Sequence, residues 1–374
     1  MQLSSFQPLA YAAAPVLSAH IDVTRTSANA ANEVELRWKS LREQFAQDGA
    51  PDAIVGDIDE RVLAPTHAPG NQGRTVFANH DGVLLDRVFP LRPMRDIAHV
   101  GIAPHLLPML RAQSLAVPYL LVRLDRAGAD ITVVDSSGAH VSERQVEGGH
   151  DVLHKVPGGG WSQRRYQSRV EDSWERNAAT VAVDLDKVVS RHCPSVVLLA
   201  GDVRAAAELH QHAGKRTREL LVDLETGGRE SGISEEALNT AVENALAAKR
   251  QQVMGEVLAR FEQEAGRDGA AADGLTAVVD ALRGGQADTL LLQDDYSSTA
   301  TLWGSDNPLV LGTTADEVRA LGGTNPTQDR ADALLLRALI AQDGGFELVE
   351  VDKVSDGVGA LLRFNARPPV PGAG

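Results

Sequence analysis

Cysteine, aromatic residues and long apolar runs are all scarce in this chain of 374 residues. The single cysteine, Cys193, cannot form an internal disulfide, which is typical of proteins in a reducing cytosol. It precedes Pro194 and an apolar run, so we expect a small buried residue at the start of a strand. A nucleophile or a metal ligand is the alternative at this position. Aromatic residues make up only 4 % of the chain, so Leu, Val and Ala must build its cores.

No stretch of about 18 apolar residues occurs, which argues against a transmembrane helix. The first residues, MQLSSFQPLAYAAAP, lack the basic start and apolar core of a signal peptide. We therefore expect a cytoplasmic protein without a membrane partner. Neither the G-x-x-x-x-G-K-[ST] nor the G-x-G-x-x-G motif is present. His210 and His212 have no third ligand at convincing spacing, so we expect neither a metal nor a cofactor.

The formal net charge is −15, which argues against a protein that coats nucleic acid without specificity. Residues 155–176 reverse this sign locally, with about five basic residues against three acidic ones. An acidic body with one basic projection favours a single docking orientation on RNA, and DNA is not expected as a partner.

The projection carries a glycine run followed by polar residues and arginines, VPGGGWSQRRYQSR at 156–169. Consecutive glycines do not stabilise helix or strand, so they indicate a tight bend or a close backbone approach. Trp161 suits stacking on a nucleobase, or packing on its own loop. The arginines suit rRNA phosphates, or a solvated helix face. The candidate RNA-binding residues are Gly158, Gly159, Gly160, Trp161, Ser162, Gln163, Arg164, Arg165 and Arg169.

The order of elements predicts three domains, at residues 1–117, 118–235 and 236–374. The first is an α+β domain with an amphipathic helix over Asn29 to Gln47 and a hairpin turning at Asn79 to Gly82. In the second, strands and helices alternate and predict an α/β unit with a mostly parallel sheet and a long helix over 164–192. The third repeats the α/β alternation. The loop Gly70, Asn71, Gln72, Gly73 and Arg74 has the charge and flexibility to touch RNA, or forms an ordinary hairpin approach.

This organisation resembles the archaeal and eukaryotic class-one peptide chain release factors and Pelota. The resemblance rests on the strand pair at 119–135, the glycine loop at 158–163, the basic helix and the strand ending in "LAG" at 197–201. In the third domain it rests on "ALRGGQADTLLL" and the final stretch 356–364. Among bacteria the chain is similar to the Balon-type ribosome hibernation factors, and its Ala/Arg/Gly-rich style indicates a high-GC organism such as an actinobacterium.

The resemblance implies binding in the A site of the 70S ribosome, on 16S and 23S rRNA. It places the first domain, with 70–74 as a possible decoding-centre loop, near the decoding centre. The glycine loop would face the peptidyl transferase centre. The third domain would be the platform for a translational GTPase, which in bacteria is elongation factor Tu.

Two departures from the family bear on activity. The release factors carry Gly-Gly-Gln, whereas here Trp161 and Ser162 separate Gly160 from Gln163. In extended backbone this displaces the amide by several ångströms, at about 3.3 Å per residue, so efficient hydrolysis is not expected. The family's Asn-Ile-Lys-Ser tetrapeptide is also absent from the first domain. A literal Gly-Gly-Gln at 284–286 follows an amphipathic helix and is interpreted as its C-cap.

Three functions stay open from the sequence. The first is a non-catalytic factor that occupies the A site of idle ribosomes in stress or dormancy. The second is a peptidyl-tRNA hydrolase, release factor or rescue factor that uses Gln163. The third is a regulatory protein that binds another RNA, or a GTPase alone.

Overall fold

The computed structural model describes residues 1, 3–27, 29–66, 70–115, 117–125, 128–135, 140–147, 161–225, 234–267, 269–295, 297–350 and 352–364. For residues 140, 141, 143, 147 and 161–174 it describes the backbone alone. The chain divides into two compact units. Unit 1 joins Met1–Leu115 to Val253–Gly374, and unit 2 is Ala116–Gln252. The division into three domains stays a prediction. Within the described residues, none of the helices combines the length and apolar character that crossing a bilayer requires.

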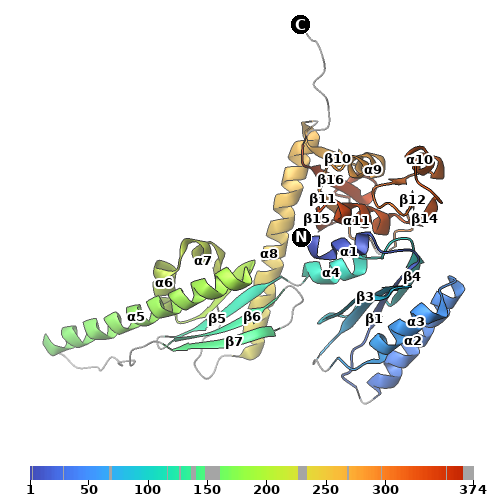
Figure 1. Cartoon of the computed structure of the whole chain (residues 1–374). Helices are drawn as coiled ribbons and strands as arrows, with labels where there is room; N and C mark the ends of the chain where they lie inside the picture. The colour runs from blue at the N-terminus through green and yellow to red at the C-terminus, as the bar shows by residue number, and fades with distance from the viewer. Residues whose placement is uncertain are drawn as a thin grey trace, which may run out of the picture. The chain divides into compact units, whose positions relative to one another are not determined.

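The amino-terminal half of unit 1 holds an antiparallel sheet of order β3-β2-β1-β4 (Figure 1). Its strands are β1 (Val16–Asp22), β2 (Gly73–Asn79), β3 (Gly82–Phe89) and β4 (Ile97–Gly101). The helices of this half are α1 (Gln7–Ala10), α2 (Ala30–Gln47), α3 (Asp52–Leu63) and α4 (Leu107–Leu115), with a short 3-10 turn η1 (Ser4–Phe6). The sequence predicted α2 and the β2–β3 hairpin closely, and it missed α3.

The two faces of this sheet have different neighbours because side chains alternate along a strand. Leu17, Ala19 and Ile21 of β1 pack with the apolar stripes of α2 and α3, which lie side by side on that face (Figure 1). Ser18 and His20 point to the opposite face, which we call the inner face. These two polar side chains are also buried, so the inner face is covered by other parts of unit 1 and not by solvent.

The carboxy-terminal half of unit 1 is built on a sheet of order β10-β16-β11-β15, with β11 and β15 parallel. Its strands are β10 (Ala271–Asp273), β11 (Ala287–Gln293), β15 (Gly345–Val349) and β16 (Val358–Leu362). A smaller sheet, of order β13-β12-β14, contains β12 (Thr301–Gly304), β13 (Leu311–Gly312) and β14 (Thr327–Arg330). The helices are α9 (Leu275–Arg283), α10 (Ala315–Ala320) and α11 (Ala331–Ala341), with a 3-10 turn η2 (Ser355–Gly357).

The two halves of unit 1 share one hydrophobic core. Leu3, Phe6 and Leu106 belong to the same buried cluster as Leu336 and Phe346. At its edge the Arg337 guanidinium donates to the Ala10 carbonyl at 2.8 Å, although 327 positions separate them in the chain. This continuous core makes the halves a single compact body.

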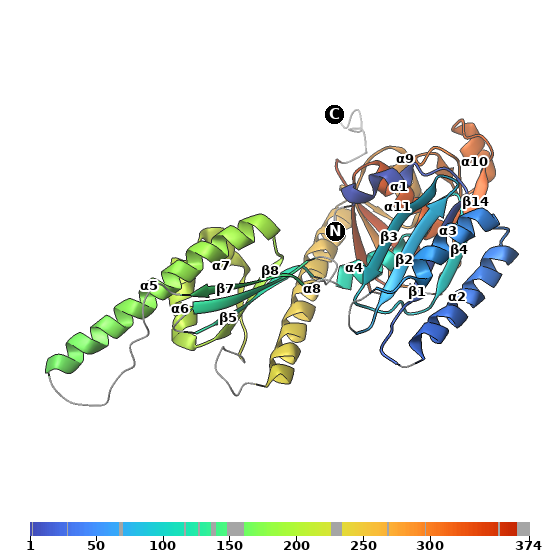
Figure 2. The same ribbon diagram turned by 60° about the horizontal axis from the view of Figure 1, so that its bottom comes forward.

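Unit 2 is a five-stranded sheet of order β7-β6-β5-β8-β9 between two layers of helices (Figure 2). Its strands are β5 (Tyr119–Leu124), β6 (Gly128–Val134), β7 (His140–Glu147), β8 (Val196–Gly201) and β9 (Leu221–Asp223). Its helices are α5 (Trp161–His192), α6 (Val203–His212) and α7 (Lys215–Leu220). A further helix, α8 (Glu235–Gly266), carries the chain from unit 2 into unit 1.

The prediction of a mostly parallel sheet was wrong. β5, β8 and β9 pair in parallel, but β6 and β7 add two antiparallel pairings. Short connections allow only antiparallel neighbours, whereas the crossover through α5 returns the chain parallel to β5. The inner strand β8 is buried on both faces: Val197 and Leu199 pack with α5, and Val196 and Leu198 pack with Leu238 of α8. This explains its continuous apolar sequence.

Candidate functional site

The described part of the glycine loop is helical. Trp161, Ser162 and Gln163 form the first residues of α5, so the expected loop of 158–163 is wrong at its second half. Gly158, Gly159 and Gly160 lie outside the described residues. The extended-backbone estimate for the Gln163 displacement therefore has to be replaced by helix geometry. A helix advances about 1.5 Å and turns about 100° per residue.

The amino-terminal part of α5 extends past the end of the sheet (Figures 1 and 2). A helix of 32 residues spans about 48 Å at 1.5 Å per residue, whereas β8, with 6 residues, spans about 20 Å. The buried residues described on α5 begin at Asn177 and Ala178. The positions of Arg164, Arg165 and Arg169 precede them, on the part of the helix that extends past the sheet.

The second candidate loop, 70–74, does not offer its charge to a partner. Arg74 lies within β2 and is 9 % exposed. Its guanidinium holds Asp86 of β3 through two hydrogen bonds, of 2.7 Å from Nε and 2.6 Å from Nη2. Gln72 is 2 % exposed, and Gly73 already pairs with Phe89 in the sheet. For these three residues the expected RNA contact is corrected to a structural role. Gly70 and Asn71 are exposed.

The Gly-Gly-Gln at 284–286 is a helix C-cap, as predicted. Gly284 caps α9 and Gly285 takes a left-handed φ of 67°. The Gln286 amide donates to Ala281 at 2.9 Å and the Gly285 amide to Leu282 at 3.2 Å. These are the two hydrogen bonds of a Schellman motif, so this tripeptide has a structural explanation.

The expectation of a buried Cys193 was wrong. Its side chain is exposed, and its backbone has a φ of 46° at the end of α5. The buried apolar run starts three residues later, at Val196. His210 contacts Asp223 at 2.9 Å, and no group of three or more His, Cys, Asp or Glu that could hold a metal occurs among the described residues.

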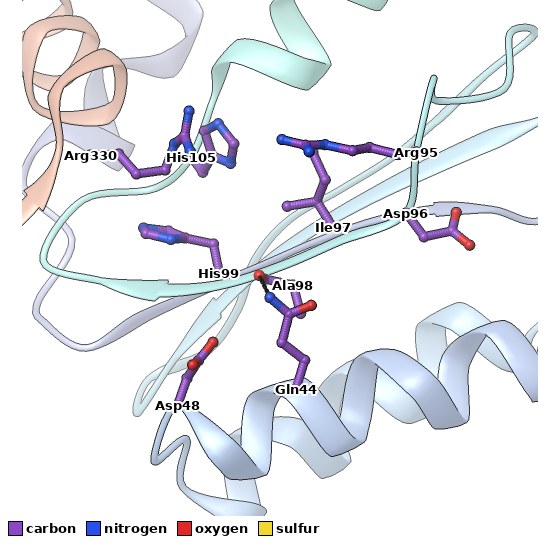
Figure 3. A pocket seen from close by; sticks show the side chains of 9 residues that line it. All are labelled: Gln44, Asp48, Arg95, Asp96, Ile97, Ala98, His99, His105 and Arg330. Carbon is purple, nitrogen blue, oxygen red and sulfur yellow. Dashed lines mark hydrogen bonds between the residues drawn. The ribbon is translucent and has the colours of Figure 1, made fainter. Parts of the chain in front are cut away.

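A cavity of about 350 Å³ lies in unit 1 beside the outer edge of β4 (Figure 3). Gln44 of α2 and Asp48, which caps this helix, line one side, and His105 and Arg330 lie on the other. The Gln44 amide donates to the Ala98 carbonyl at 3.1 Å and so joins α2 to this strand. The remaining lining residues are Arg95, Asp96, Ile97, Ala98 and His99. Acidic and basic groups are mixed here, so the cavity has no single charge.

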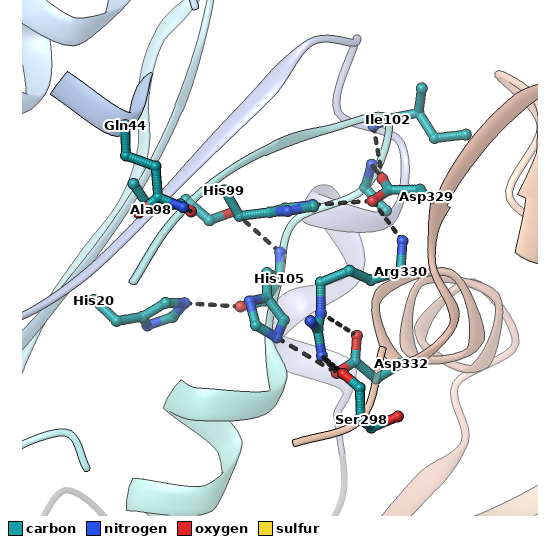
Figure 4. A network of polar contacts seen from close by, with 12 residues as sticks. His20, Gln44, Ala98, His99, Ile102, His105, Ser298, Asp329, Arg330 and Asp332 are labelled. Atoms are coloured by element: carbon teal, nitrogen blue, oxygen red, sulfur yellow. Dashed lines mark hydrogen bonds and ion pairs between the residues drawn. The ribbon is translucent and has the colours of Figure 1, made fainter. Parts of the chain in front are cut away.

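Beside the cavity, and partly lining it, lies a group of buried and half-buried polar residues that the sequence analysis did not bring together (Figure 4). We call it the histidine cluster; its members are His20, His99, His105, Asp329, Arg330 and Asp332. His20 Nε2 lies 2.9 Å from the His105 carbonyl, and His99 Nε2 lies 3.0 Å from Asp329 Oδ1. His105 Nε2 lies 3.4 Å from Asp332 Oδ2. The three histidines come from the amino-terminal half of unit 1 and the other members from the carboxy-terminal half.

Several backbone groups fix this arrangement. Asp329 accepts hydrogen bonds from the amides of Ile102 and Ala103, at 2.8 and 3.2 Å. The Arg330 guanidinium donates two hydrogen bonds to the Asp332 carboxylate, of 3.0 Å from Nε and 2.6 Å from Nη2. At Gly101 a Cβ atom would collide with the Asp329 carboxylate, so β4 needs glycine there. The cluster is therefore a close joint between the two halves.

Burial controls the protonation of the cluster. Burial, reinforced by the charge of His105, lowers the pKa of His20 to about 3. Burial also lowers the pKa of His105, and Asp332 offsets this only in part. Burial opposes ionisation of Asp332, but His105 and the Arg330 guanidinium outweigh it and hold the pKa of this carboxyl well below its usual range. At neutral pH, His20 and His105 are neutral and Asp332 is charged.

One signal in the sequence points to part of this cluster. In the strand SAHID, Ser18 and His20 occupy alternate positions, and alternate positions share one face of a strand. A polar face of this kind is ordinarily taken as solvent-exposed. Part of its cover comes from His105, whose amide donates to Ser18 Oγ at 3.0 Å and whose carbonyl accepts from His20, and local patterns cannot associate this distant residue with β1.

Comparison with known proteins gives the following. Residues 118–267 match the model of bacterial archaeo-eukaryotic release factor family 2. The uncharacterized protein Rv2629 of Mycobacterium tuberculosis H37Rv is 28 % identical over 363 residues, which cover 96 % of each chain.

Two solved structures are similar over most of their length. The archaeal translation termination factor aRF1 is 14 % identical, with a TM-score of 0.24, over 97 % of this chain and 96 % of its own. Saccharomyces cerevisiae Dom34, a translation termination-like factor, is 12 % identical, with a TM-score of 0.38, over 80 % of this chain and 81 % of its own. The sheets and helices described above establish the mixed α/β fold.

Proposed function

We propose that this protein is a ribosome-binding translation factor that occupies the A site of idle 70S ribosomes during stress or dormancy. One observation carries the proposal: the segment that matches the bacterial release factor model, 118–267, contains both the glycine run and the overhanging helix α5. In this proposal residues 158–163 are directed to the peptidyl transferase centre. The protein then blocks the site without acting on an ester.

The geometry of α5 supports occupation without efficient hydrolysis. Trp161 and Ser162 stand between Gly160 and Gln163. In a helix two residues move the following side chain by about 3 Å along the axis and about 200° around it. Gln163 would therefore leave the helix on a different side from a glutamine placed directly after the glycines. Since a misplacement of about 1 Å can cost about 10²-fold in rate, Gln163 is poorly placed to position a water.

The charge of α5 supports an RNA partner. The overhanging part has arginines at 164, 165 and 169 in a chain of net charge −15. Contacts to phosphates supply most of the salt-dependent affinity for nucleic acid. We propose that these arginines contact 23S rRNA, and that Gly70 and Asn71 approach 16S rRNA. For the carboxy-terminal half we propose elongation factor Tu as the partner.

Sedimentation with ribosomes tests the proposal. The wild-type protein should pellet with 70S particles, and Arg164→Glu/Arg165→Glu/Arg169→Glu should bind more weakly, with a salt slope lower by about 1 for each lost phosphate contact. The matched control is Arg204→Glu/Lys215→Glu/Arg216→Glu, which reverses the same number of charges at three exposed cations of unit 2. Absence of the wild-type protein from 70S particles would sink the proposal, as would full binding by the α5 variant.

The alternative is a peptidyl-tRNA hydrolase or rescue factor. The observation in its favour is the place of Gln163 in the first turn of α5, three positions after the last glycine of the run. Ribosomes carrying labelled peptidyl-tRNA distinguish the two functions. Peptide release that disappears in Gln163→Ala would establish the hydrolase, whereas occupation of the A site without release supports the proposal above.

A further inference from the structure

The histidine cluster is the polar part of the joint between the two halves of unit 1. His20 projects from the inner face of the amino-terminal sheet, and His105 follows β4 on the way to α4 (Figure 4). Asp329 and Arg330 end β14, and Asp332 begins α11. The apolar core beside the cluster is insensitive to pH, so a response of the joint to acid must come from titratable groups. The cluster supplies several of these, beside the pairs of Arg111 with Asp294 and of the Met1 amino group with Glu347.

Both ring nitrogens of His20 have a hydrogen-bond partner in its neutral form. A carbonyl oxygen can only accept, so Nε2 carries the hydrogen that bonds the His105 carbonyl at 2.9 Å. Nδ1 then accepts from the Thr75 hydroxyl at 2.9 Å. A second proton would fall on Nδ1, so the Thr75 hydroxyl would have to turn and accept, and the added charge would be buried in a site where His20 is 1 % exposed. Among the described residues, the ring has no carboxylate partner to balance the charge.

His105 is held between groups of both signs. Asp332 of α11 faces its Nε2, while Arg330 of β14 and the ring of His99 on β4 lie on the same side. The His20 ring of β1 is 5.8 Å away between centroids. From α2 and the start of β4, Asp48, Arg95 and Asp96 line the adjoining cavity. A proton on His105 would be attracted by Asp332, but Arg330 already neutralises the charge of that carboxylate. The proton would also lie close to the rings of His20 and His99.

We propose that the histidine cluster is an acid-sensitive latch. At neutral pH it holds the inner face of the amino-terminal sheet to residues 329–332, and acid loosens this contact within unit 1. The inference is independent of the proposed function, because it concerns the free protein alone.

The direction of the pH effect on the closed contact follows from proton linkage. A histidine whose pKa is lowered in the closed state takes up its proton only when the contact opens, so closure weakens as the pH falls below about 6.5, the ordinary histidine pKa. For His20, with a pKa of about 3, the closing equilibrium at about pH 5 is weakened about thirtyfold. His105 adds to this effect in the same direction, since its pKa is also lowered.

Hydrogen exchange of the whole chain tests the latch. Exchange, corrected for its intrinsic dependence on pH, is followed at the amides of β1, β4 and α11 at about pH 7 and about pH 5. We expect the wild-type protein to lose protection there by about thirtyfold or more in acid, while β5 and β8 of unit 2 keep theirs. In His20→Gln/His105→Gln the amides can replace the two Nε2 donors but cannot take up a proton, so protection should no longer depend on pH.

His80→Gln is the matched control. His80 is an exposed histidine at the β2–β3 turn of the same sheet, and its replacement should leave the wild-type response to acid unchanged. Equal wild-type protection at both pH values would overturn the latch, as would an acid response that persists in the double variant.

A second measurement serves if the double variant does not fold. Nuclear magnetic resonance titration of the histidine rings in the wild-type protein should find His20 and His105 neutral down to the pH at which the contact opens. Ring titration of either residue near or above pH 6.5, with the contact still closed, would overturn the proposal.

Discussion

Arg74 illustrates how a single side chain can change an interpretation. Its guanidinium is the one charge that made 70–74 resemble an RNA-binding loop, yet it binds Asp86 inside the sheet. An arginine beside two glycines looks exposed in the sequence, because nothing local shows that a carboxylate on the next strand lies opposite. The partner becomes visible only with the pairing of β2 and β3, which places Arg74 and Asp86 two positions apart along the ladder.

The first prediction concerns this ion pair. Arg74→Ala should lower the free energy of unfolding of unit 1 by about 3 kcal/mol, the lower end of the range for removing one partner of a buried pair, because Asp86 keeps some contact with solvent. Arg42→Ala is the control: Arg42 pairs with Asp59 at 3.1 Å but is largely exposed, so it should cost less than about 1 kcal/mol. Urea denaturation, with hydrogen exchange at β1–β3 marking unit 1, measures both. Equal costs would show that burial does not govern the pair.

Elements with local causes were predicted well from the sequence. Val34, Trp38, Leu41 and Phe45 recur at helical spacing, and all four are buried in α2. The hairpin at 79–82 and the cap of α9 follow equally from short-range patterns. The failures lie at element boundaries. α5 begins earlier than expected because a helix can include the polar residues after a glycine run, and Cys193 ends that helix where a strand was expected to begin.

The second prediction distinguishes a cap from a catalytic motif at Gly284-Gly285-Gln286. Gly285→Ala should destabilise the protein by about 1–2 kcal/mol, the cost of a left-handed conformation for a residue with a Cβ. Gly284→Ala should be nearly neutral, because Gly284 has a φ of −78° and its added Cβ would meet only the flexible Gln286 side chain. Thermal denaturation compares these adjacent, chemically identical changes. Similar melting temperatures for the two variants would contradict the Schellman geometry.

At the scale of the whole molecule, the net charge limits which nucleic acids the protein can bind. A net charge of −15 repels polyanions over the whole surface, and only a shaped RNA surface can reach the basic part of α5 without meeting the acidic remainder. The same argument separates this chain from proteins that bind single strands through long basic grooves.

The third prediction follows from this balance. For unstructured RNA such as poly(U), at about physiological salt, we expect a Kd above about 10⁻⁴ M, which is the weakest affinity typical of non-specific binding. Fluorescence anisotropy with labelled poly(U) measures it, and sedimentation with 70S particles provides the comparison. An affinity for poly(U) equal to that for ribosomes would refute the argument from charge.

The discontinuous make-up of unit 1 has a consequence for synthesis of the chain. Its amino-terminal half emerges first and can bury one face of its sheet at once against α2 and α3. The other face needs residues 253–374, which follow only after all of unit 2 has been translated. Until then Phe77, Leu106 and the two histidines beside them are without their final cover. The nascent chain therefore has an interval of vulnerability to aggregation, and its length is set by the speed of elongation through residues 116–252.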